Sequence, residues 1–413
     1  MNDLKYIAMI LTFLAAQSFG TANVKAITVY GASSTLPSGY LNTHGSQIVD
    51  GTGRSVRIAC VGGMGTVVVG GRLGYMNTPA ELDSTLHNIR AAGFNCLRVD
   101  FNDKNVNEPS VMSQFDQLVA SCKLHKVKVI FDNHNDEATP ANWQNAAQQS
   151  NGLWFDSGPG TDGTDGAGDK GTVTDKIFQQ DWVKMAKHWS GNDTVVGFDI
   201  RNEPCAHTST PALWGGNGPT DIHAMYERVG NAVLKANPHA LIICESVINY
   251  RTGFYEGDLS VVKTDPIILS NPAKLVYSIH EYPKEIGGYS GPEFGPGYIS
   301  RMNKSWGWLV KDGIAPVWVG EMGSSMKTAA EKAWGTTLLD YMDGHAPDGP
   351  RFSPKQQPIS GDWWCWGHRP GELPDGCLGK DGTLRPEQLP FINALQYVSR
   401  VPGHHQLGAE HIR

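Results

Sequence analysis

The amino-acid sequence predicts an α/β protein in which a single (β/α)8 barrel, the TIM barrel fold, occupies residues 27–401. From residue 54 onward, short apolar runs rich in β-branched residues alternate with longer segments of helical period, which is typical of parallel βα units. Polar side chains gather where the apolar runs end. A barrel with long loops accounts for a chain of this length with a single core, so we expect one domain.

Eight apolar runs are expected to form the strands. They are Val56–Val61, Cys96–Val99, Val127–Phe131, Val195–Ile200, Leu241–Cys244, Leu275–Ile279, Pro316–Val319 and Asp362–Trp366. Seven amphipathic segments are expected to form helices. They are Pro79–Ala92, Val111–His125, Ile177–Trp189, Ile222–Asn237, Tyr298–Lys311, Ala329–Met342 and Pro386–Ser399. The fifth strand is followed only by a weaker segment.

An open, doubly wound parallel sheet is the competing architecture. Such a sheet normally carries a Gly-rich phosphate-binding turn between an early strand and the next helix. The segment Gly62–Gly65 leads into Val67–Val69 and lacks both the spacing and the helix of that turn. The sequence therefore favours the barrel and argues against a nucleotide-dependent oxidoreductase.

The composition excludes other classes of partner. The formal net charge is −7 and no basic run is interleaved with aromatic residues, so the electrostatic signature of a nucleic-acid-binding protein is missing. With 40% hydrophobic and 18% charged residues, the chain resembles an ordinary globular protein. We expect a monomer that acts on a neutral substrate.

The two ends of the chain differ from the predicted barrel. Residues 1–26 combine a lysine, an apolar run and then small residues, as in a secretory signal peptide. The run is too short to span a bilayer, so we expect a secreted protein, extracellular or periplasmic, without a membrane anchor in its mature form. Because Asp3 is unusual in a signal peptide, an ordinary apolar N-terminus is the alternative. Residues 402–413 are expected to form a polar tail.

The seven cysteines fall into two groups. Cys60, Cys96 and Cys244 lie in or beside apolar runs, where a buried free thiol is the simplest expectation. Cys365 and Cys377 bracket a short Gly/Pro-rich loop, so a disulfide between them and two separate thiols are both open.

The segment 158–171 is crowded with Gly and Asp and is expected to be a surface insertion. It matches no complete calcium-loop pattern, so a solvated loop is favoured over a calcium site. No Cys/His spacing indicates a zinc site. We therefore expect no metal and no cofactor.

Ten polar or aromatic residues lie at the carboxyl ends of the predicted strands. They are Arg98, Asp100, Asp132, His134, Asn202, Glu203, His280, Tyr282, Glu321 and Trp366. This end of a (β/α)8 barrel collects side chains from all eight units, so we expect one shared site. A protonated carboxyl beside an ionised one can cleave a glycosidic bond, and Glu203 and Glu321 are placed for these roles. Two rim glutamates in ion pairs are the structural alternative.

Two segments around these glutamates resemble glycoside hydrolase family 5, the cellulase-type family of clan A. They are Gly197–Pro204, which holds an Asn-Glu-Pro signature, and Pro316–Gly323. Shorter motifs follow in the order of the family: Leu97-Arg98, Asp132-Asn133-His134, His280-Glu281-Tyr282 and Trp364-Cys365-Trp366. The resemblance covers about residues 53–384 and is closest to the bacterial endo-β-1,4-glucanase subfamily.

The resemblance implies a role for each matching residue. Glu203 corresponds to the acid/base and Glu321 to the nucleophile of a retaining mechanism, with carboxyl groups about 5 to 5.5 Å apart. Asn202 corresponds to the residue that contacts the sugar 2-hydroxyl. Arg98 corresponds to the cation that keeps the nucleophile ionised, because a nearby guanidinium lowers a carboxyl pKa.

The remaining matches imply contacts with the sugar in the −1 subsite, which lies directly before the bond that is cleaved. His134 corresponds to a hydroxyl contact, and His280 and Tyr282 correspond to the pair that flanks the two carboxyl groups. Trp366 corresponds to the aromatic platform under the sugar. For a lone His or Trp, packing in the core is the alternative.

One region departs from the family pattern and bears on the substrate. After the first strand, an aromatic-rich segment is replaced by Gly62–Gly65, and aromatic faces supply much of the binding to sugar rings. Candidate substitutes on neighbouring loops are Tyr75, Trp143, Trp154 and Trp214, and packing of the loop is the alternative for each. We expect a secreted endo-β-1,4-glucanase that acts on a β-linked polysaccharide or oligosaccharide. The alternatives are the same mechanism on mannan, xyloglucan or glycolipid head groups, and a carbohydrate-binding protein without catalysis.

Overall fold

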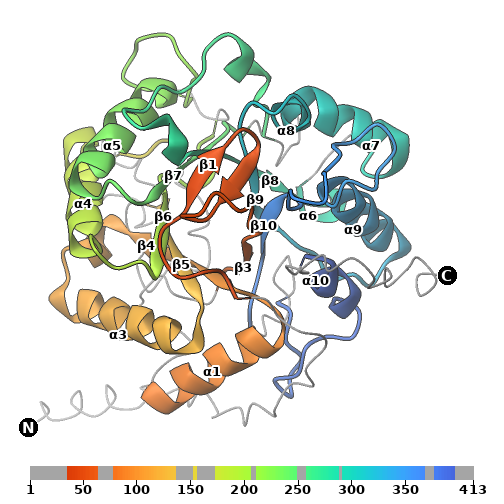
Figure 1. Ribbon diagram of the computed structural model, residues 1–413, viewed down its shortest axis with the longest axis horizontal. Helices are drawn as coiled ribbons and strands as arrows, with labels where there is room; N and C mark the ends of the chain where they lie inside the picture. The colour runs from red at the N-terminus through yellow and green to blue at the C-terminus, as the bar shows by residue number, and fades with distance from the viewer. Residues whose placement is uncertain are drawn as a thin grey trace, which may run out of the picture.

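The structure is a computed structural model that describes residues 35–63, 78–135, 152–155, 173–205, 211–248, 257–287, 291–367 and 376–395. Eight parallel strands form a closed barrel in the order β10-β3-β4-β5-β6-β7-β8-β9 (Figure 1). They are β3 (Ala59–Val61), β4 (Cys96–Asn102), β5 (Lys128–Asn135), β6 (Val195–Asp199), β7 (Leu241–Glu245), β8 (Leu275–Glu281), β9 (Val317–Met322) and β10 (Ser360–Trp363). Each predicted strand is confirmed, and the barrel is the fold that the sequence predicts.

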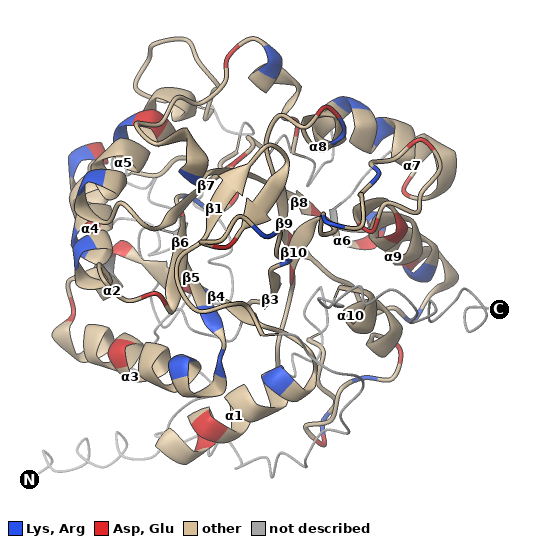
Figure 2. Cartoon of the chain, viewed as in Figure 1, with Lys and Arg blue, Asp and Glu red and all other residues tan. Residues whose placement is uncertain are grey.

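Helices surround the barrel (Figure 1). The longer ones are α1 (Pro79–Ala91), α3 (Pro109–His125), α4 (Asp175–His188), α5 (Ile222–Ala236), α7 (Gly295–Met302), α9 (Ala329–Met342) and α10 (Leu389–Leu395). Shorter ones are α2 (Asp103–Val106), α6 (Lys284–Gly287), α8 (Trp308–Lys311) and the 3-10 helices η3 (Ser260–Lys263) and η4 (Pro272–Lys274). The weak segment after the fifth strand thus holds only η3 and η4 in its described part. Charges of both signs are mixed over the outer helices (Figure 2).

Local sequence signals begin the helices where they were expected. In α1, the Thr78 hydroxyl accepts from the Glu81 N–H and the Glu81 carboxylate accepts from the Thr78 N–H, which satisfies two backbone groups that a helix start leaves unpaired. Thr328 and Glu331 form the same capping box at α9.

The predicted helix Tyr298–Lys311 is interrupted. Between α7 and α8 the chain forms a π-helix, η5 (Asn303–Gly307). A Cβ atom at Gly307 would collide with the Tyr341 hydroxyl, which donates to Asn303 Oδ1 at 2.8 Å. The Tyr341 side chain of α9 therefore packs closely against the widened turn. The hydrophobic periodicity of the segment 298–311 does not reveal this contact with a distant helix.

Side chains inside the barrel change from apolar to polar along the strands. Successive strand residues point to opposite faces, so every second residue faces the barrel axis. In β7, Leu241 and Ile243 belong to the apolar interior cluster, and Glu245 continues this row at the carboxyl end. In β4, Cys96 is followed on the same face by Arg98. The polar end of this interior is where the candidate site lies.

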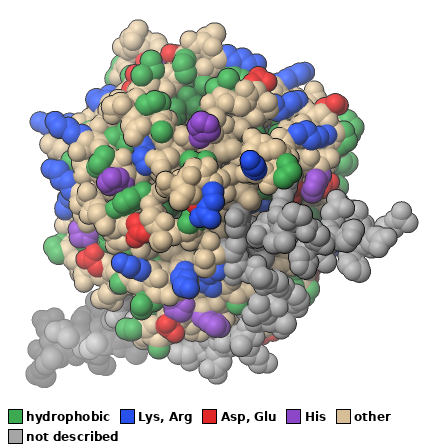
Figure 3. Space-filling view, viewed as in Figure 1, with side chains coloured by type: hydrophobic (Ala, Val, Ile, Leu, Met, Phe, Trp, Pro, Cys, Tyr) green, Lys and Arg blue, Asp and Glu red, His purple; other side chains and the backbone are tan. Residues whose placement is uncertain are grey.

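The apolar end of the barrel is closed by a hairpin of β1 (Asn42–His44) and β2 (Gln47–Val49). Leu41 and Ile48 belong to the same buried cluster as Val276 and Trp318 of the barrel interior. The hairpin crosses the centre of the view in Figure 1, and Figure 3 shows this whole face of the molecule, on which basic, acidic and hydrophobic side chains are interspersed.

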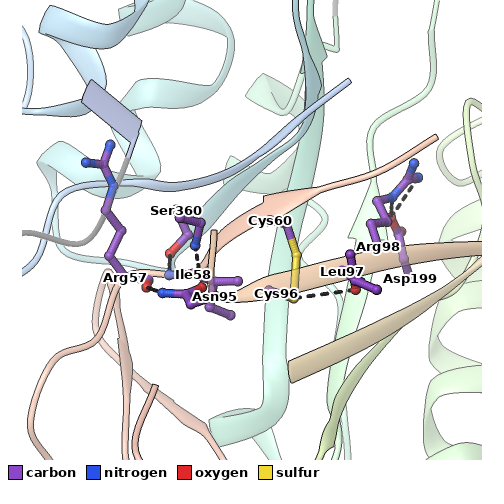
Figure 4. The surroundings of a disulfide bond; sticks show 10 residues. Arg57, Ile58, Cys60, Asn95, Cys96, Leu97, Arg98, Asp199 and Ser360 are labelled. Atoms are coloured by element: carbon purple, nitrogen blue, oxygen red, sulfur yellow. Dashed lines mark hydrogen bonds and ion pairs between the residues drawn. A yellow bond between two sulfur atoms is a disulfide. The ribbon is translucent and has the colours of Figure 1, made fainter. Parts of the chain in front are cut away.

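The structure corrects the cysteine predictions. Cys60 of β3 and Cys96 of β4 form a disulfide inside the barrel (Figure 4), so the expectation that both are free thiols is wrong. The two residues lie directly opposite in the parallel register, which only the assembled sheet defines. Cys365 and Cys377 are buried thiols without a disulfide, and Cys244 is a buried thiol as expected.

Several predictions fall on residues that the structure does not describe. They are the signal peptide at 1–26, the tail at 402–413 and the Gly/Asp-rich segment 158–171. Within the described part of the chain, none of the helices has the length and apolar character needed to cross a membrane.

Candidate active site

Glu203 follows β6 in an unusual backbone conformation. Its φ of 44° lies in the left-handed region, which residues other than glycine seldom occupy. The chain before it is fixed to both neighbouring strands, because Ile200 N–H donates to Ile243 O at 3.0 Å and Asn202 N–H donates to Asn133 O at 2.9 Å. The Glu203 carboxyl is 3% exposed and contacts His280 Nδ1 at 2.8 Å.

Glu321 projects from β9 and is held by two donors. Arg98 Nη1 donates to Glu321 Oε1 at 2.7 Å, and the Tyr282 hydroxyl donates to Oε2 at 2.7 Å. Burial raises the pKa of Glu321, while Arg98, His134 and the Tyr282 hydrogen bond oppose that rise. Glu321 is therefore buried, which favours the protonated carboxyl, and is held by donors that favour the ionised carboxylate.

The two glutamates face each other across His280. A carboxylate oxygen of Glu203, one of Glu321 and a ring nitrogen of His280 all lie within 4.8 Å of one another. Retaining glycosidases have carboxyl groups about 5 to 5.5 Å apart, whereas inverting ones need about 6.5 to 9.5 Å to admit a water molecule. The observed spacing fits the shorter class.

Arg98 is completely buried and forms ion pairs with Asp132, Asp199 and Glu321, of which the pair with Asp199 can be followed in Figure 4. Its Nε donates to Asp199 Oδ2 at 3.0 Å, its Nη2 donates to Asn202 Oδ1 at 2.8 Å, and Nη2 lies 3.0 Å from Asp132 Oδ1. Burial raises the pKa of Asp199 to about 7 against the effect of Arg98. The Arg98 guanidinium thus orients Asn202 and Glu321 and forms ion pairs with three carboxylates at once.

The surroundings of His280 favour its neutral form. Burial lowers its pKa well below the ordinary value, and the positive charges of Arg98 and His134 add to the effect. Gly320 leaves room for the ring, because a Cβ there would approach His280 Nε2 to 3.1 Å and the Ser278 hydroxyl to 2.5 Å. A neutral imidazole can hydrogen-bond to Glu203 without fixing that carboxyl in its ionised form.

His134 contacts Asp132 and Trp364. Its Nδ1 contacts Asp132 Oδ2 at 2.6 Å, and its ring stacks on Trp364 with centroids 5.4 Å apart and planes inclined by 8°. Burial alone would lower the pKa of His134, but the Asp132 carboxylate raises it above the ordinary value.

The two tryptophans Trp364 and Trp366, of which Trp366 is the predicted aromatic platform, differ in their surroundings. Trp366 is 3% exposed, belongs to the core between strands and helices, and donates its backbone N–H to Gly62 O at 2.9 Å. Trp364 is the half-buried tryptophan that stacks on His134. A Cβ at Gly63 would come within 3.0 Å of the Trp364 ring, so the glycines after β3 make room for it.

Two of the four candidate aromatic substitutes, Trp154 and Trp214, lie in the described part of the chain, and both form hydrogen bonds there. Trp154 is buried and donates Nε1 to Asp175 at 2.7 Å, and Trp214 donates Nε1 to Asp265 O at 3.0 Å. Both serve packing. Tyr75 and Trp143 lie outside the described residues.

Four residues near the site were missed by sequence reasoning. They are Asp199, Glu245, Asp362 and Trp364. Glu245 is fully buried and accepts the Glu203 N–H at 2.7 Å, and Asp362 is fully buried next to Arg98, which opposes the rise that burial causes in the pKa of Asp362. Asp199 and Asp362 fall inside predicted strands, so a search of strand ends passed over them. Glu245 directly follows a predicted strand and was detectable.

The cluster of Glu203, His280 and Glu321 is also the group within the described residues that is close enough to hold a metal ion. Arg98 and Tyr282 already donate to the two oxygens of Glu321, and His280 Nδ1 already contacts Glu203. We therefore interpret the cluster as an acid and base pair and assign no metal to it.

A closed (β/α)8 barrel with two buried glutamates at this spacing, one bound by an arginine and a tyrosine, defines the class of glycoside hydrolases. Comparison with known families agrees. The model of the cellulase family, glycosyl hydrolase family 5, matches residues 50–369, and the chain belongs to this family.

Three of the curated relatives carry endoglucanase names, and a fourth, from Phanerodontia chrysosporium, is named Beta-xylosidase. The Endoglucanase of Paenibacillus polymyxa is 26% identical over 77% of this chain and 82% of that protein. Endoglucanase G of Acetivibrio thermocellus is 26% identical over 71% of this chain, which spans 54% of that longer protein. A solved complex of an endocellulase from Pyrococcus horikoshii with cellotetraose has a TM-score of 0.66 at 21% identity, and the likeness covers 88% of this chain and 100% of that one. This last similarity concerns the fold.

Proposed function

We propose that the protein is an endo-β-1,4-glucanase that hydrolyses β-glucan with retention of configuration. The observation that carries the proposal is the pair Glu203 and Glu321, whose carboxylates lie within 4.8 Å of each other in a family 5 barrel. The endoglucanase names of the relatives and the cellotetraose complex of the structural neighbour support a β-1,4-glucan as the substrate.

The reaction proceeds by two displacements. The Glu321 carboxylate attacks the anomeric carbon, the glycosidic C–O bond breaks, and the Glu203 carboxyl gives its proton to the departing oxygen. Glu203 then removes a proton from water, the water oxygen attacks the same carbon, and the bond to Glu321 breaks. Two inversions restore the original configuration, and no cofactor enters the balance.

The surrounding residues support these steps. Arg98 and Tyr282 stabilise the Glu321 carboxylate, and Arg98 orients the Asn202 amide toward the 2-hydroxyl of the sugar. His134 contacts a sugar hydroxyl in the −1 subsite, and His280 hydrogen-bonds to Glu203. The platform role assigned to Trp366 from the sequence passes to Trp364.

A panel of substrates tests the proposal. Carboxymethylcellulose, mixed-linkage glucan, xyloglucan, mannan and glucosylceramide are incubated with the enzyme, and new reducing ends and the loss of viscosity are measured. Rapid loss of viscosity on carboxymethylcellulose is the expected result. Preferential cleavage of mannan, xyloglucan or glucosylceramide would instead favour the alternative substrates of the same mechanism, and cleavage of none would favour a carbohydrate-binding role.

We also propose that the protein is exported and acts as a monomer. The pattern of residues 1–26 supports cleavage of a signal peptide. N-terminal sequencing of protein recovered from the culture medium or periplasm tests the cleavage, and light scattering tests the oligomeric state. An intact N-terminus on protein that stays in the cytoplasm would contradict the export proposal.

A further inference from the structure

Glu245 is a third buried glutamate at the catalytic centre. It ends β7 on the face of Leu241 and Ile243, which point into the barrel, and its side chain is 0% exposed. Its Oε2 accepts the backbone N–H of Glu203 at 2.7 Å, and its Oε1 lies 3.5 Å from His280 Nδ1. Glu245 therefore contacts the backbone of the proposed acid/base rather than the substrate.

The hydrogen bond meets a specific need of the backbone. The segments on both sides of Glu203 are fixed, since Asn202 N–H donates to Asn133 O at 2.9 Å and Ile248 N–H donates to Pro204 O at 2.7 Å. Glu203 itself has a φ of 44°, and its N–H is bonded to a side chain instead of a neighbouring strand. A left-handed residue other than glycine persists only where its surroundings hold it.

The surroundings of Glu245 favour a protonation state that is compatible with the hydrogen bond from the Glu203 N–H. Burial raises the pKa of Glu245 well above the ordinary value, and the carboxylates of Glu203 and Asp199 add to the rise, while the hydrogen bond from the Glu203 N–H and the charge of Arg98 oppose it. The carbonyl oxygen of Glu245 accepts from the Tyr226 hydroxyl at 2.9 Å, which fixes the residue from α5. A neutral carboxyl accepts the N–H without placing another negative charge beside Glu203.

We propose that Glu245 is a positioning residue for Glu203: its Oε2 atom holds the Glu203 peptide in the left-handed conformation that aims the Glu203 carboxyl at His280 and the departing oxygen. The inference rests on the proposed role of Glu203 as acid/base. It assigns to Glu245 no contact with the sugar, so its effect on catalysis passes through the proton transfers of Glu203 alone.

The test compares Glu245→Leu and Glu245→Gln on two aryl cellobiosides. One has a good leaving group, 2,4-dinitrophenol, and the other has a poor one, phenol. Because an acid is needed only when the departing oxygen is strongly basic, Glu245→Leu should lower kcat/KM about 10-fold or more on the phenyl substrate and less than ~3-fold on the dinitrophenyl substrate. Glu245→Gln keeps an acceptor and should stay within ~3-fold of wild type on both, with the alkaline limb of the pH profile in place.

Two controls make the outcome specific. Glu281 is also a buried glutamate at a strand end, but it accepts from Tyr298, Arg301 and Trp306, away from Glu203. Glu281→Leu should therefore lower kcat/KM by the same factor on both substrates, or leave both values unchanged. Glu203→Gln should show the strong dependence on leaving group that the proposed function requires.

The controls separate the two ways of failing. Equal losses on both substrates for Glu203→Gln would overturn the role of Glu203. Suppose that Glu203→Gln lowers kcat/KM more on the phenyl than on the dinitrophenyl substrate. If Glu245→Leu then lowers kcat/KM equally on both substrates, or on neither, the inference about Glu245 is wrong. If the Leu variant does not fold, Glu245→Gln decides alone: a leaving-group dependent loss or a lowered alkaline limb in that variant overturns the inference, and wild-type behaviour supports it.

Discussion

Replacement of Arg98 by Met should move the acid limb of the pH profile to higher pH. Arg98 Nη1 lies 2.7 Å from Glu321 Oε1, and both side chains are buried. Burial raises the pKa of Glu321, and Arg98 is the largest of the effects that lower it. Without Arg98 the pKa of Glu321 rises further, and the ionised nucleophile forms only at higher pH.

The expected displacement of the acid limb follows from the geometry. A cation at this distance lowers the pKa of a carboxyl by about 1 to 3. Asp199 shares the same guanidinium, which lowers its pKa, and would bind a proton more readily once Arg98 is gone, which removes negative charge near Glu321 and favours the lower part of that range. At a pH below the limb, kcat/KM falls about 10-fold each time the pKa of Glu321 rises by about 1, because the ionised fraction falls by that factor.

The assay is kcat/KM against pH on a soluble cello-oligosaccharide for wild type, Arg98→Met and Arg98→Lys. Lysine keeps the charge but lacks the planar fork that reaches Asp199, Asn202 and Glu321 together, so its acid limb should move less. Circular dichroism checks that each variant is folded, because a buried ion pair that loses one partner costs about 3–5 kcal/mol of stability. An acid limb that stays in place while KM alone rises would refute this role and make Arg98 a substrate contact.

Three further predictions concern the site. Glu321→Ala should be inactive, and azide should restore cleavage of an activated aryl glycoside to give a product of inverted configuration by NMR; activity without the anion would contradict the assignment. The wild-type pH profile should be bell-shaped, with an acid limb above the ordinary range of a glutamate because burial raises the pKa of Glu321. An acid limb at or below that range would contradict the conclusion that burial outweighs the donors around Glu321. Trp364→Ala should raise KM by roughly 2- to 10-fold with little change in melting temperature, as expected for a lost ring contact. Trp366→Ala should instead cost about 3–5 kcal/mol of stability, and the reverse pattern would return the platform to Trp366.

The barrel was predictable because its strands are signalled locally. Each run of β-branched residues needs only its own sequence to be detected, and the closed topology follows from eight of them. Contacts between distant segments were not predictable. Cys60 and Cys96 meet because of the register of β3 against β4, and the π-helix at Asn303–Gly307 forms because Tyr341 packs against it.

The site was predictable where one residue ends one strand, as for Glu203 and Glu321. The site was not predictable where two residues close together in the sequence could each fill the same role. Trp364 and Trp366 have the same residue type and nearly the same position, and only the assembled core separates them. Asp199 and Asp362 were hidden inside strands, where an acid is tolerated only because Arg98 lies beside it.

The closure of the barrel by β10 against β3 has a consequence for biosynthesis. Asp362 pairs in register with Cys60, and Arg57 donates to the carbonyl oxygen of Ile359, 302 residues later in the chain. At about 5–20 residues per second, the ribosome delivers the last strand ~15–60 s after the first one. During that interval β3 and later β9 present open edges to other chains. A chain that stops before Ser360 would keep both edges, so premature termination should yield aggregates rather than a smaller enzyme.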